Sequence, residues 1–189
     1  MKTELREYKK EDYETIKNII RKTWNYDQLT DSKTANKLAK VFLDSCLNNY
    51  TFSRVALQDE KVIGIILLND IKNHKFSFRK TMKQFKSVTS LLLSKNGRQV
   101  CKLFGNISGL DNELLKENNK KYQAELSLFA IDENARGLGI GKMLFNEVLN
   151  NNKKDNITDF YLFTDTSCNY GFYERLRFFI VGEPLKLYK

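Results

Sequence analysis

Three glycines at alternate positions constrain this chain more than any other feature of its sequence. They stand directly after a strand-like run, Ala124–Ile131, and directly before a run with helical periodicity. Glycine has no Cβ, so the main chain can approach another group closely, and the first N–H groups of the helix point where its dipole favours negative charge. The segment predicts a cradle for a pyrophosphate, with a tight turn that binds nothing as the alternative. It reads Arg136, Gly137, Leu138, Gly139, Ile140, Gly141, Lys142.

Two well-known glycine-rich loops do not fit this segment. A P-loop has four residues between its glycines and a hydroxyl residue after its lysine, whereas Met143 follows Lys142 here. A Rossmann fingerprint needs Gly-x-Gly-x-x-Gly, and the spacing here is Gly-x-Gly-x-Gly. The residues therefore argue against both of these nucleotide-binding loops.

Two blocks of sequence together resemble a known family. The first is the Arg-x-x-Gly-x-Gly pattern of the loop, preceded by Leu128–Asp132, and the second is Asp165–Glu174, which holds an Asn and a Tyr. In this order they resemble the acetyl-CoA loop, and the following strand end and helix, of the GNAT N-acetyltransferase superfamily. The resemblance implies an α/β fold with a mixed central sheet flanked by helices, and splayed parallel strands at the cofactor site. It also implies acetyl-CoA as cosubstrate and no metal.

The resemblance assigns residues to the cofactor. A bulge in the strand before the loop would splay it from its parallel neighbour, and the pantetheine arm would then pair with the freed main-chain groups like an extra strand. The residues expected to bind acetyl-CoA on this basis are Phe129, Ala130, Ile131, Arg136, Gly137, Leu138, Gly139, Ile140, Gly141, Lys142, Asn169 and Phe172.

Acyl transfer to an amine uses an acid and a base, and the sequence offers one residue of each kind near these blocks. Tyr173 is the candidate acid, because a phenol can protonate a leaving thiolate of similar basicity. A packed core tyrosine is the alternative. Glu125 is the candidate base, acting through water, and a solvated charge at a strand edge is the alternative. Glu125 shares a face with Phe129 unless a bulge between them resets the alternation.

The composition is that of an ordinary globular protein. The 189 residues can form one domain with a sizeable core, and 41% are hydrophobic and 29% charged. No apolar run approaches the ~18 residues that span a bilayer, and no signal peptide is visible. The three cysteines are widely spaced and typical of reduced thiols. We expect one cytoplasmic domain, residues 1–189, with no metal.

The net charge of +9 is concentrated in one segment. Residues 71–110 contain no Asp or Glu, whereas the rest of the chain is balanced. We expect a basic helical insertion at about 70–120, between the third and fourth strands. It contains an amphipathic helix near Phe78–Leu92, a break at Asn96-Gly97 and a short helix at Asp111–Lys121. Three interpretations stay open: a solvated helix face over the active site, a site for an acidic substrate or part of the cofactor, and a nucleic-acid or membrane surface.

These observations favour an acyltransferase that moves acetyl from acetyl-CoA directly to a primary amine of a small molecule or peptide. The alternatives are a catalytically silent CoA-binding sensor or interaction module, and a nucleic-acid-binding protein that uses residues 71–110. The family commonly has Gly where Arg177 stands here, and the tail after Phe178 is short. A second copy of the chain can complete such an edge, so a homodimer is compatible with the sequence. Nucleic acid and membrane are not the expected partners.

Overall fold

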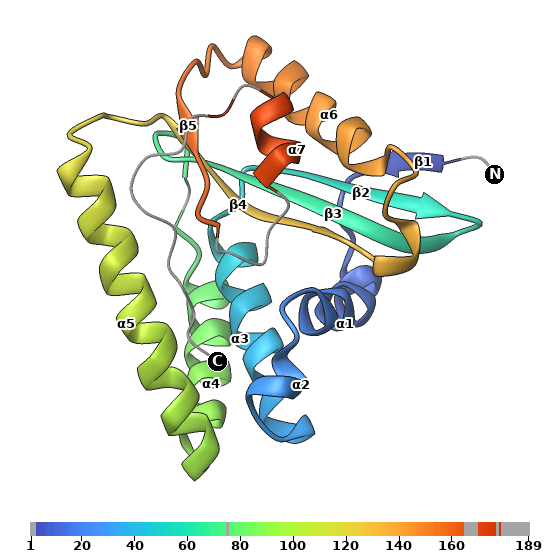
Figure 1. The fold of residues 1–189 in the computed structure, drawn as a ribbon. Helices are drawn as coiled ribbons and strands as arrows, with labels where there is room; N and C mark the ends of the chain where they lie inside the picture. The colour runs from blue at the N-terminus through green and yellow to red at the C-terminus, as the bar shows by residue number, and fades with distance from the viewer. Residues whose placement is uncertain (1–2, 75, 165–169, 177, 179–189) are drawn as a thin grey trace.

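A five-stranded mixed sheet forms the centre of the molecule (Figure 1). The computed structural model describes residues 3–74, 76–164, 170–176 and 178. The strands lie in the order of the chain, and only the last pair, β4 and β5, is parallel. The expected α/β fold with a mixed central sheet is confirmed. The strands are β1 Thr3–Arg6, β2 Phe52–Gln58, β3 Lys61–Asp70, β4 Ala124–Ile131 and β5 Phe160–Tyr161.

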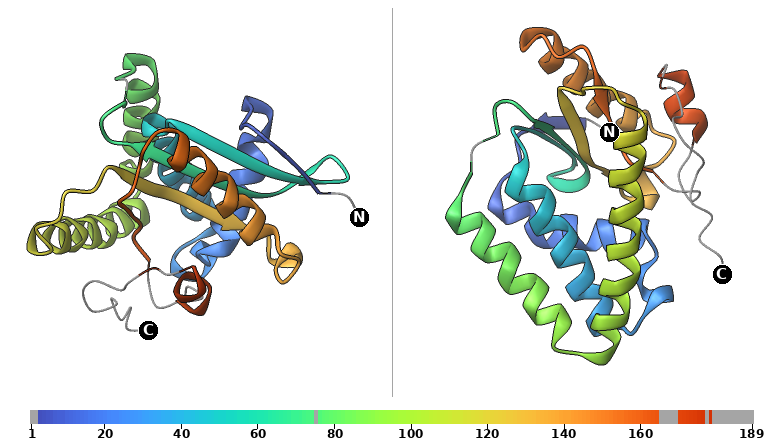
Figure 2. Two further views of the ribbon diagram at one scale, coloured as in Figure 1. Left: turned by 90° about the horizontal axis from the view of Figure 1, so that it is seen from above. Right: turned by 90° about the vertical axis from the view of Figure 1, so that its left-hand side faces the viewer.

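Helices cover both faces of the sheet (Figures 1 and 2). Helices α1 to α5 lie on one face and α6 covers the other, with a separate apolar core on each side. None of the described helices is long and apolar enough to cross a membrane. The helices are η1 Lys10–Asp12, α1 Tyr13–Thr23, α2 Tyr26–Leu29, α3 Ser32–Asn49, α4 Phe78–Leu92, α5 Lys95–Glu117, η2 Glu133–Ala135, α6 Ile140–Lys154 and α7 Tyr170–Arg175.

Local sequence signals set several of these boundaries. The Asp31 carboxylate accepts the N–H groups of Lys33 and Thr34 at 3.1 Å and so caps α3. Asp59 and Glu60 form the two-residue turn between β2 and β3, both with positive φ. Both the cap and the hairpin depend on residues close together in the chain.

The segment between β3 and β4 forms two helices, α4 and α5, which confirms the helical insertion. The turn between them lies at Leu93-Ser94, earlier than the expected break at Asn96-Gly97, and Asn96 and Gly97 belong to the first turn of α5. Ser94 caps α5 by accepting the N–H of Gly97 at 3.0 Å, so the helix can begin in spite of the glycine. We expected a separate short helix at Asp111–Lys121. The structure instead has one continuous 23-residue helix. Two glycines lower the helical signal of its middle part, but Val100 and Phe104 pack against the core and hold it in place.

A buried carboxylate joins the insertion to the core. Asp44 of α3 is 3% exposed, and it accepts hydrogen bonds from Tyr13, Lys40, Lys83 and Ser87. Burial alone would raise the pKa of Asp44, but these four donors outweigh it and hold that pKa below its ordinary value. Lys83 also lies 3.9 Å from the centre of the Tyr13 ring. This basic residue of the insertion therefore anchors α4 to α1 and α3.

Candidate active site

A β-bulge in β4 shapes the region in front of the glycine loop. Leu67 of β3 pairs with Leu128, but the next residue, Leu68, pairs with Leu126, so Ser127 is the extra residue on β4. An extra residue reverses which face the following side chains occupy. Accordingly, Leu126 packs in the core beneath α6, whereas Leu128 packs in the core on the opposite face.

The parallel strands β4 and β5 separate directly after they meet. Among the described residues their pairing consists of Ala124 with Phe160 and Glu125 with Tyr161, while β4 continues to Ile131. The rest of β4 stays paired with β3 on its other side. The splay of parallel strands that the sequence implied is therefore present.

The main-chain groups on the open edge of β4 can be identified from the register. Asp132 donates its N–H to the carbonyl of Ile63 at 2.8 Å. Hydrogen-bonded pairs alternate along an antiparallel ladder, so Ala130 also directs its groups to β3, whereas Phe129 and Ile131 direct theirs to the open edge. Of the three strand residues expected to contact the cofactor, the geometry favours Phe129 and Ile131.

The glycine loop has the conformation that its sequence predicts. Gly137 and Gly139 adopt φ values of +80° and +77°, which residues with a side chain rarely adopt. A Cβ added at either one meets no heavy atom of the described residues within 4 Å, so both face open space. Met143 donates to the carbonyl of Gly139 at 3.1 Å and closes the first turn of α6. The main-chain N–H groups of the first turn, which precede Met143, have no hydrogen-bond acceptor within the helix. The N-cap residue, Gly139, has no side chain that could accept from them.

The loop residues differ in exposure and therefore in role. Arg136, Leu138 and Lys142 are exposed, and both cations flank the open N–H groups. Ile140 and Gly141 are buried. A Cβ on Gly141 would lie 3.1 Å from Ile131 and 3.3 Å from Phe172, so this glycine permits close packing of α6 against β4 and α7. The third glycine is thus a packing residue, unlike the two that face open space.

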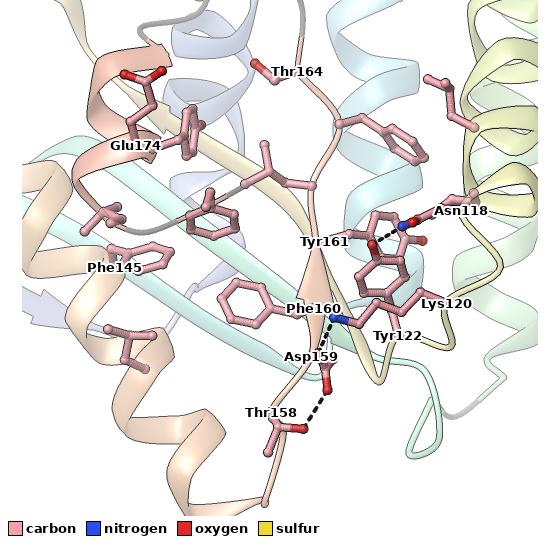
Figure 3. A pocket seen from close by; sticks show the side chains of 18 residues that line it. Asn118, Lys120, Tyr122, Phe145, Thr158, Asp159, Phe160, Tyr161, Thr164 and Glu174 are labelled. Carbon is pink, nitrogen blue, oxygen red and sulfur yellow. Dashed lines mark hydrogen bonds and ion pairs between the residues drawn. The ribbon is translucent and has the colours of Figure 1, made fainter. Parts of the chain in front are cut away.

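Phe172 and Tyr173 of α7 pack beside the open part of β4. The Phe129 ring lies 5.6 Å from the Phe172 ring and 6.5 Å from the Tyr173 ring, measured between centroids. Tyr173 is half-buried and lines a cavity of about 600 Å³ next to β5 (Figure 3). Asn169, which was expected to contact the cofactor, lies outside the described residues, as does Arg177.

Glu125 lies on the opposite face of the sheet from Phe129, because the bulge lies between them. Its neighbours Ala124 and Leu126 belong to the core beneath α6, so Glu125 points towards α3 and α5. Burial raises the pKa of Glu125 above its ordinary value, a hydrogen bond from Asn69 partly opposes this, and the negative charge of Asp111 on α5 adds to it. A raised pKa in a half-buried carboxyl is typical of a general base.

Two tyrosines form an aromatic cluster next to Glu125: Tyr161 on β5 and Tyr122 on the chain before β4. Tyr161 is paired with Glu125 in the strand register, and Figure 3 shows it pointing towards α5, away from Phe160. The Tyr161 and Tyr122 rings are 5.1 Å apart, and Asn118 donates a hydrogen bond to the Tyr122 hydroxyl. Burial raises the pKa of Tyr161 to about 12, with further contributions from the charges of Glu125 and Asp111.

Asp111, Tyr122 and Tyr161 were not among the site residues predicted from the sequence. Asp111 did have a signal, since it is the first acidic residue after the acid-free segment 71–110. The two tyrosines had none, because their closeness depends on where β4 and β5 pair. Within the described residues, no three His, Cys, Asp or Glu side chains lie close enough together to hold a metal ion.

Comparison with known proteins yields one family model and a set of solved structures with a similar fold. The model of the acetyltransferase (GNAT) family matches residues 13–178. No curated protein sequence matches the chain significantly. Among solved structures, the chain resembles PH1933 from Pyrococcus horikoshii OT3, with 18% identity over 96% of this chain and 92% of that one and a TM-score of 0.59.

Two further structures contain ligands. One is a GNAT family acetyltransferase from Brucella melitensis in complex with acetyl-CoA, with 16% identity over 98% of this chain and 92% of that one and a TM-score of 0.52. The other is the PaiA N-acetyltransferase from Thermoplasma acidophilum in complex with coenzyme A, with 19% identity over 94% and 88% and a TM-score of 0.50. At these identities the similarity describes the fold.

Proposed function

The chain belongs to the acetyltransferase (GNAT) family, and from this premise we propose that it moves acetyl from acetyl-CoA to a primary amine of a small molecule or peptide. One observation carries the proposal: β4 separates from β5 after Glu125, next to a loop with two glycines in the left-handed conformation. In this proposal residues 1–189 form a single acetyltransferase domain. The structures of similar proteins with coenzyme A and acetyl-CoA support the choice of cosubstrate.

The residues present fit acetyl-CoA. The open N–H groups of Gly139–Lys142, with Arg136 and Lys142 beside them, suit the pyrophosphate. The open edge at Phe129 and Ile131 suits the amides of the pantetheine arm, which can pair with it as a strand would. Leu138 and Ile140 contribute their main-chain groups to the same loop, and Phe172 closes the side next to α7. Asn169 and Ala130 stay in the proposal as predicted neighbours of the cofactor.

Bound acetyl-CoA supplies an activated acetyl thioester, and the chain supplies the proton transfers. Glu125, whose raised pKa keeps it a stronger base than an ordinary glutamate, accepts the proton of the attacking amine through water. Tyr173, on the other side of the open edge, donates a proton to the leaving sulfur. The bulge explains why the base and the acid lie on different sides of β4. It directs Glu125 to one face of the sheet and Phe129, against which Tyr173 packs, to the other.

The same geometry favours a cationic acceptor. Glu125 and Asp111 are two partly buried carboxyls. Burial raises the pKa of both, and repulsion by the charge of Asp111 adds to the rise for Glu125. Neither forms an ion pair among those found in the described residues. A protonated amine nearby would relieve this repulsion, and the rings of Tyr122 and Tyr161 would add cation–π attraction. We therefore expect amines with a second positive charge to be better acceptors than monoamines.

A screen of acceptors tests the proposal. Polyamines, monoamines, amino acids and basic peptides are incubated with acetyl-CoA, and acetylated product is measured by mass spectrometry together with thiol release. The proposal predicts acetylated amine and free thiol in equal amounts for at least one cationic amine. Binding of acetyl-CoA without any product across the panel would instead indicate the catalytically silent module.

A further inference from the structure

Helix α4 exposes an apolar stripe that the proposed activity does not use. The stripe consists of Phe78, Met82, Phe85 and Leu92, which are 70%, 38%, 64% and 41% exposed. Their spacing of four, three and seven residues places them on one side of the helix. The buried residues of α4, Ser87 and Leu91, lie on the opposite side and pack towards the core. The stripe is therefore additional to the face by which α4 is held in the fold.

Basic residues of the same helix border this stripe. Arg79 and Lys86 lie along one side of it, Lys83 on that side is paired with Asp44, and the whole segment 71–110 contains no Asp or Glu. Phe76, two residues before the first residue of the helix, is 73% exposed and extends the apolar surface. A surface of this kind, with aromatic side chains in the middle and basic residues beside them, suits a partner that is both apolar and negatively charged.

We propose that α4 docks on the surface of an anionic lipid bilayer, with the stripe in the boundary between headgroups and acyl chains. A helix with one apolar face and basic residues beside it lies in the plane of such an interface, and its Lys and Arg side chains reach the anionic headgroups. Burial of the phenylalanines supplies the apolar part of the binding, and the acid-free segment supplies the electrostatic part.

The composition of the α4 surface argues against binding partners other than a bilayer. A nucleic acid would place phosphates against phenylalanines and would leave the apolar stripe exposed. A second copy of the chain would bring two acid-free basic faces together, and like charges repel. The stripe lies on the outer side of one helix, and its residues line neither the cavity next to β5 nor a second cavity between α3 and the start of α5, which are the places where a peptide would find a groove.

The position of α4 leaves the candidate active site accessible. The left view of Figure 2 shows α4 at one side of the molecule and the loop before α6 at the other. Contact between α4 and a bilayer would therefore leave the cofactor loop open to solvent.

Vesicle flotation with the full-length protein tests the proposal. Vesicles of phosphatidylcholine alone are compared with vesicles that also contain phosphatidylglycerol, at low salt and at ~0.5 M salt. We expect the protein to float with the anionic vesicles at low salt, to bind neutral vesicles at least about tenfold less, and to be released as salt rises. Absence of flotation with anionic vesicles, or equal binding to both compositions, would overturn the proposal.

Matched variants separate this contact from general adhesion. Phe78→Ser with Phe85→Ser, and separately Arg79→Glu with Lys86→Glu, change exposed side chains and should each lower vesicle binding about tenfold or more while the thermal unfolding midpoint stays within ~2 °C. Leu29→Ser, an exposed leucine on α2, and Lys153→Glu with Lys154→Glu, on α6, are the controls.

Two results with these variants would contradict a bilayer contact through α4. The first is equal loss of binding in the controls. The second is a concentration-dependent dimer, detected by light scattering, that the phenylalanine variant abolishes while wild type shows no vesicle binding. That second result would mean that the stripe on α4 binds a second copy of the chain.

Discussion

Among the described residues, Glu125 and Tyr161 form the last pair that joins β4 to β5. Beyond this pair the two strands separate, and the main-chain groups of Phe129 and Ile131 face an open edge. The proposed base therefore lies where the sheet opens. A carboxylate in this position is partly removed from water by the same strands that leave room for an extended ligand, which connects its raised pKa to the architecture of the site.

The pH dependence of acceptor turnover tests Glu125. Burial and the charge of Asp111 raise the pKa of Glu125, so activity should fall, as pH decreases, at a higher pH than an ordinary glutamate would give. Asp111→Asn removes the nearby negative charge, favours ionised Glu125 and should move this acidic limb to lower pH. Glu125→Gln should remove the limb and lower kcat about 10²- to 10⁴-fold. An acidic limb that is unchanged in Asp111→Asn would contradict the coupling.

Gly139→Ala should weaken acetyl-CoA binding by roughly tenfold or more in calorimetric titration. The new Cβ projects into the open space in front of the loop, and the left-handed conformation adds a strain of about 1 kcal/mol. Gly105→Ala is the matched control, because Gly105 lies in the middle of α5 and its Cβ also meets nothing within 4 Å among the described residues. The control should bind normally and unfold at an equal or higher temperature. Normal affinity in Gly139→Ala would show that the glycine serves only the turn.

Gly141→Val should differ from Gly139→Ala in what it damages. The valine side chain would press on Ile131 and Phe172, whose nearest atoms lie 3.1 and 3.3 Å from the position that a Cβ would occupy. We expect a loss of about 1–3 kcal/mol in the free energy of unfolding, measured by chemical denaturation, and a secondary loss of affinity. Wild-type stability in this variant would mean that α7 can move away from α6 without cost.

Tyr173→Phe should lower kcat about ten- to a thousandfold while acetyl-CoA affinity stays nearly constant. The hydroxyl acts mainly when the thiolate leaves, whereas the ring keeps its packing against Phe129 and Phe172. Tyr50→Phe, a half-buried tyrosine packed against Tyr8, is the control and should retain wild-type kinetics. Pre-steady-state measurements establish that chemistry limits the rate. Unchanged kcat under those conditions would return Tyr173 to a packing role.

Asp44→Asn should destabilise the protein by about 2 kcal/mol or more at pH 7, since it weakens the contacts that hold α4 to α1 and α3. The folded-state pKa of Asp44 is below its ordinary value, so the stability that it contributes is complete above pH ~4 and is lost as pH falls further. The difference between variant and wild type in denaturant unfolding should therefore close in acid. A difference that persists there would refute this network as its source.

The sequence predicted the parts of the site that depend on neighbouring residues. The loop was predictable because the φ values of Gly137 and Gly139 exclude most other residues, and because a helix follows directly. The role of Gly141 was not, because its contact with Phe172 joins segments far apart in the chain. The bulge at Ser127 was expected from the family resemblance, but its position arises from pairing with β3 and cannot be found within β4 alone.

For the basic segment, residues 71–110, the sequence likewise predicted local structure but not long-range packing. Its charge and helical period were evident, but whether its cations face the acceptor depends on packing. The structure directs Lys83 to Asp44 and leaves the apolar stripe of α4 exposed. The end of α5 contributes Leu114 and Asn118 to the cavity, and the charge of Asp111 acts on Glu125. A solvated face over the site was thus only one of several arrangements that the same sequence pattern permits.

Amide hydrogen exchange with and without acetyl-CoA tests the central claim most directly, since it reports which main-chain N–H groups a ligand covers. At a concentration that raises the unfolding temperature, the account predicts slower exchange in the peptides that contain Phe129–Ile131 and Gly137–Lys142, and unchanged exchange in α4. Protection elsewhere without protection in these two segments, or no protection at all, would contradict the assignment of this edge and loop as the acetyl-CoA site.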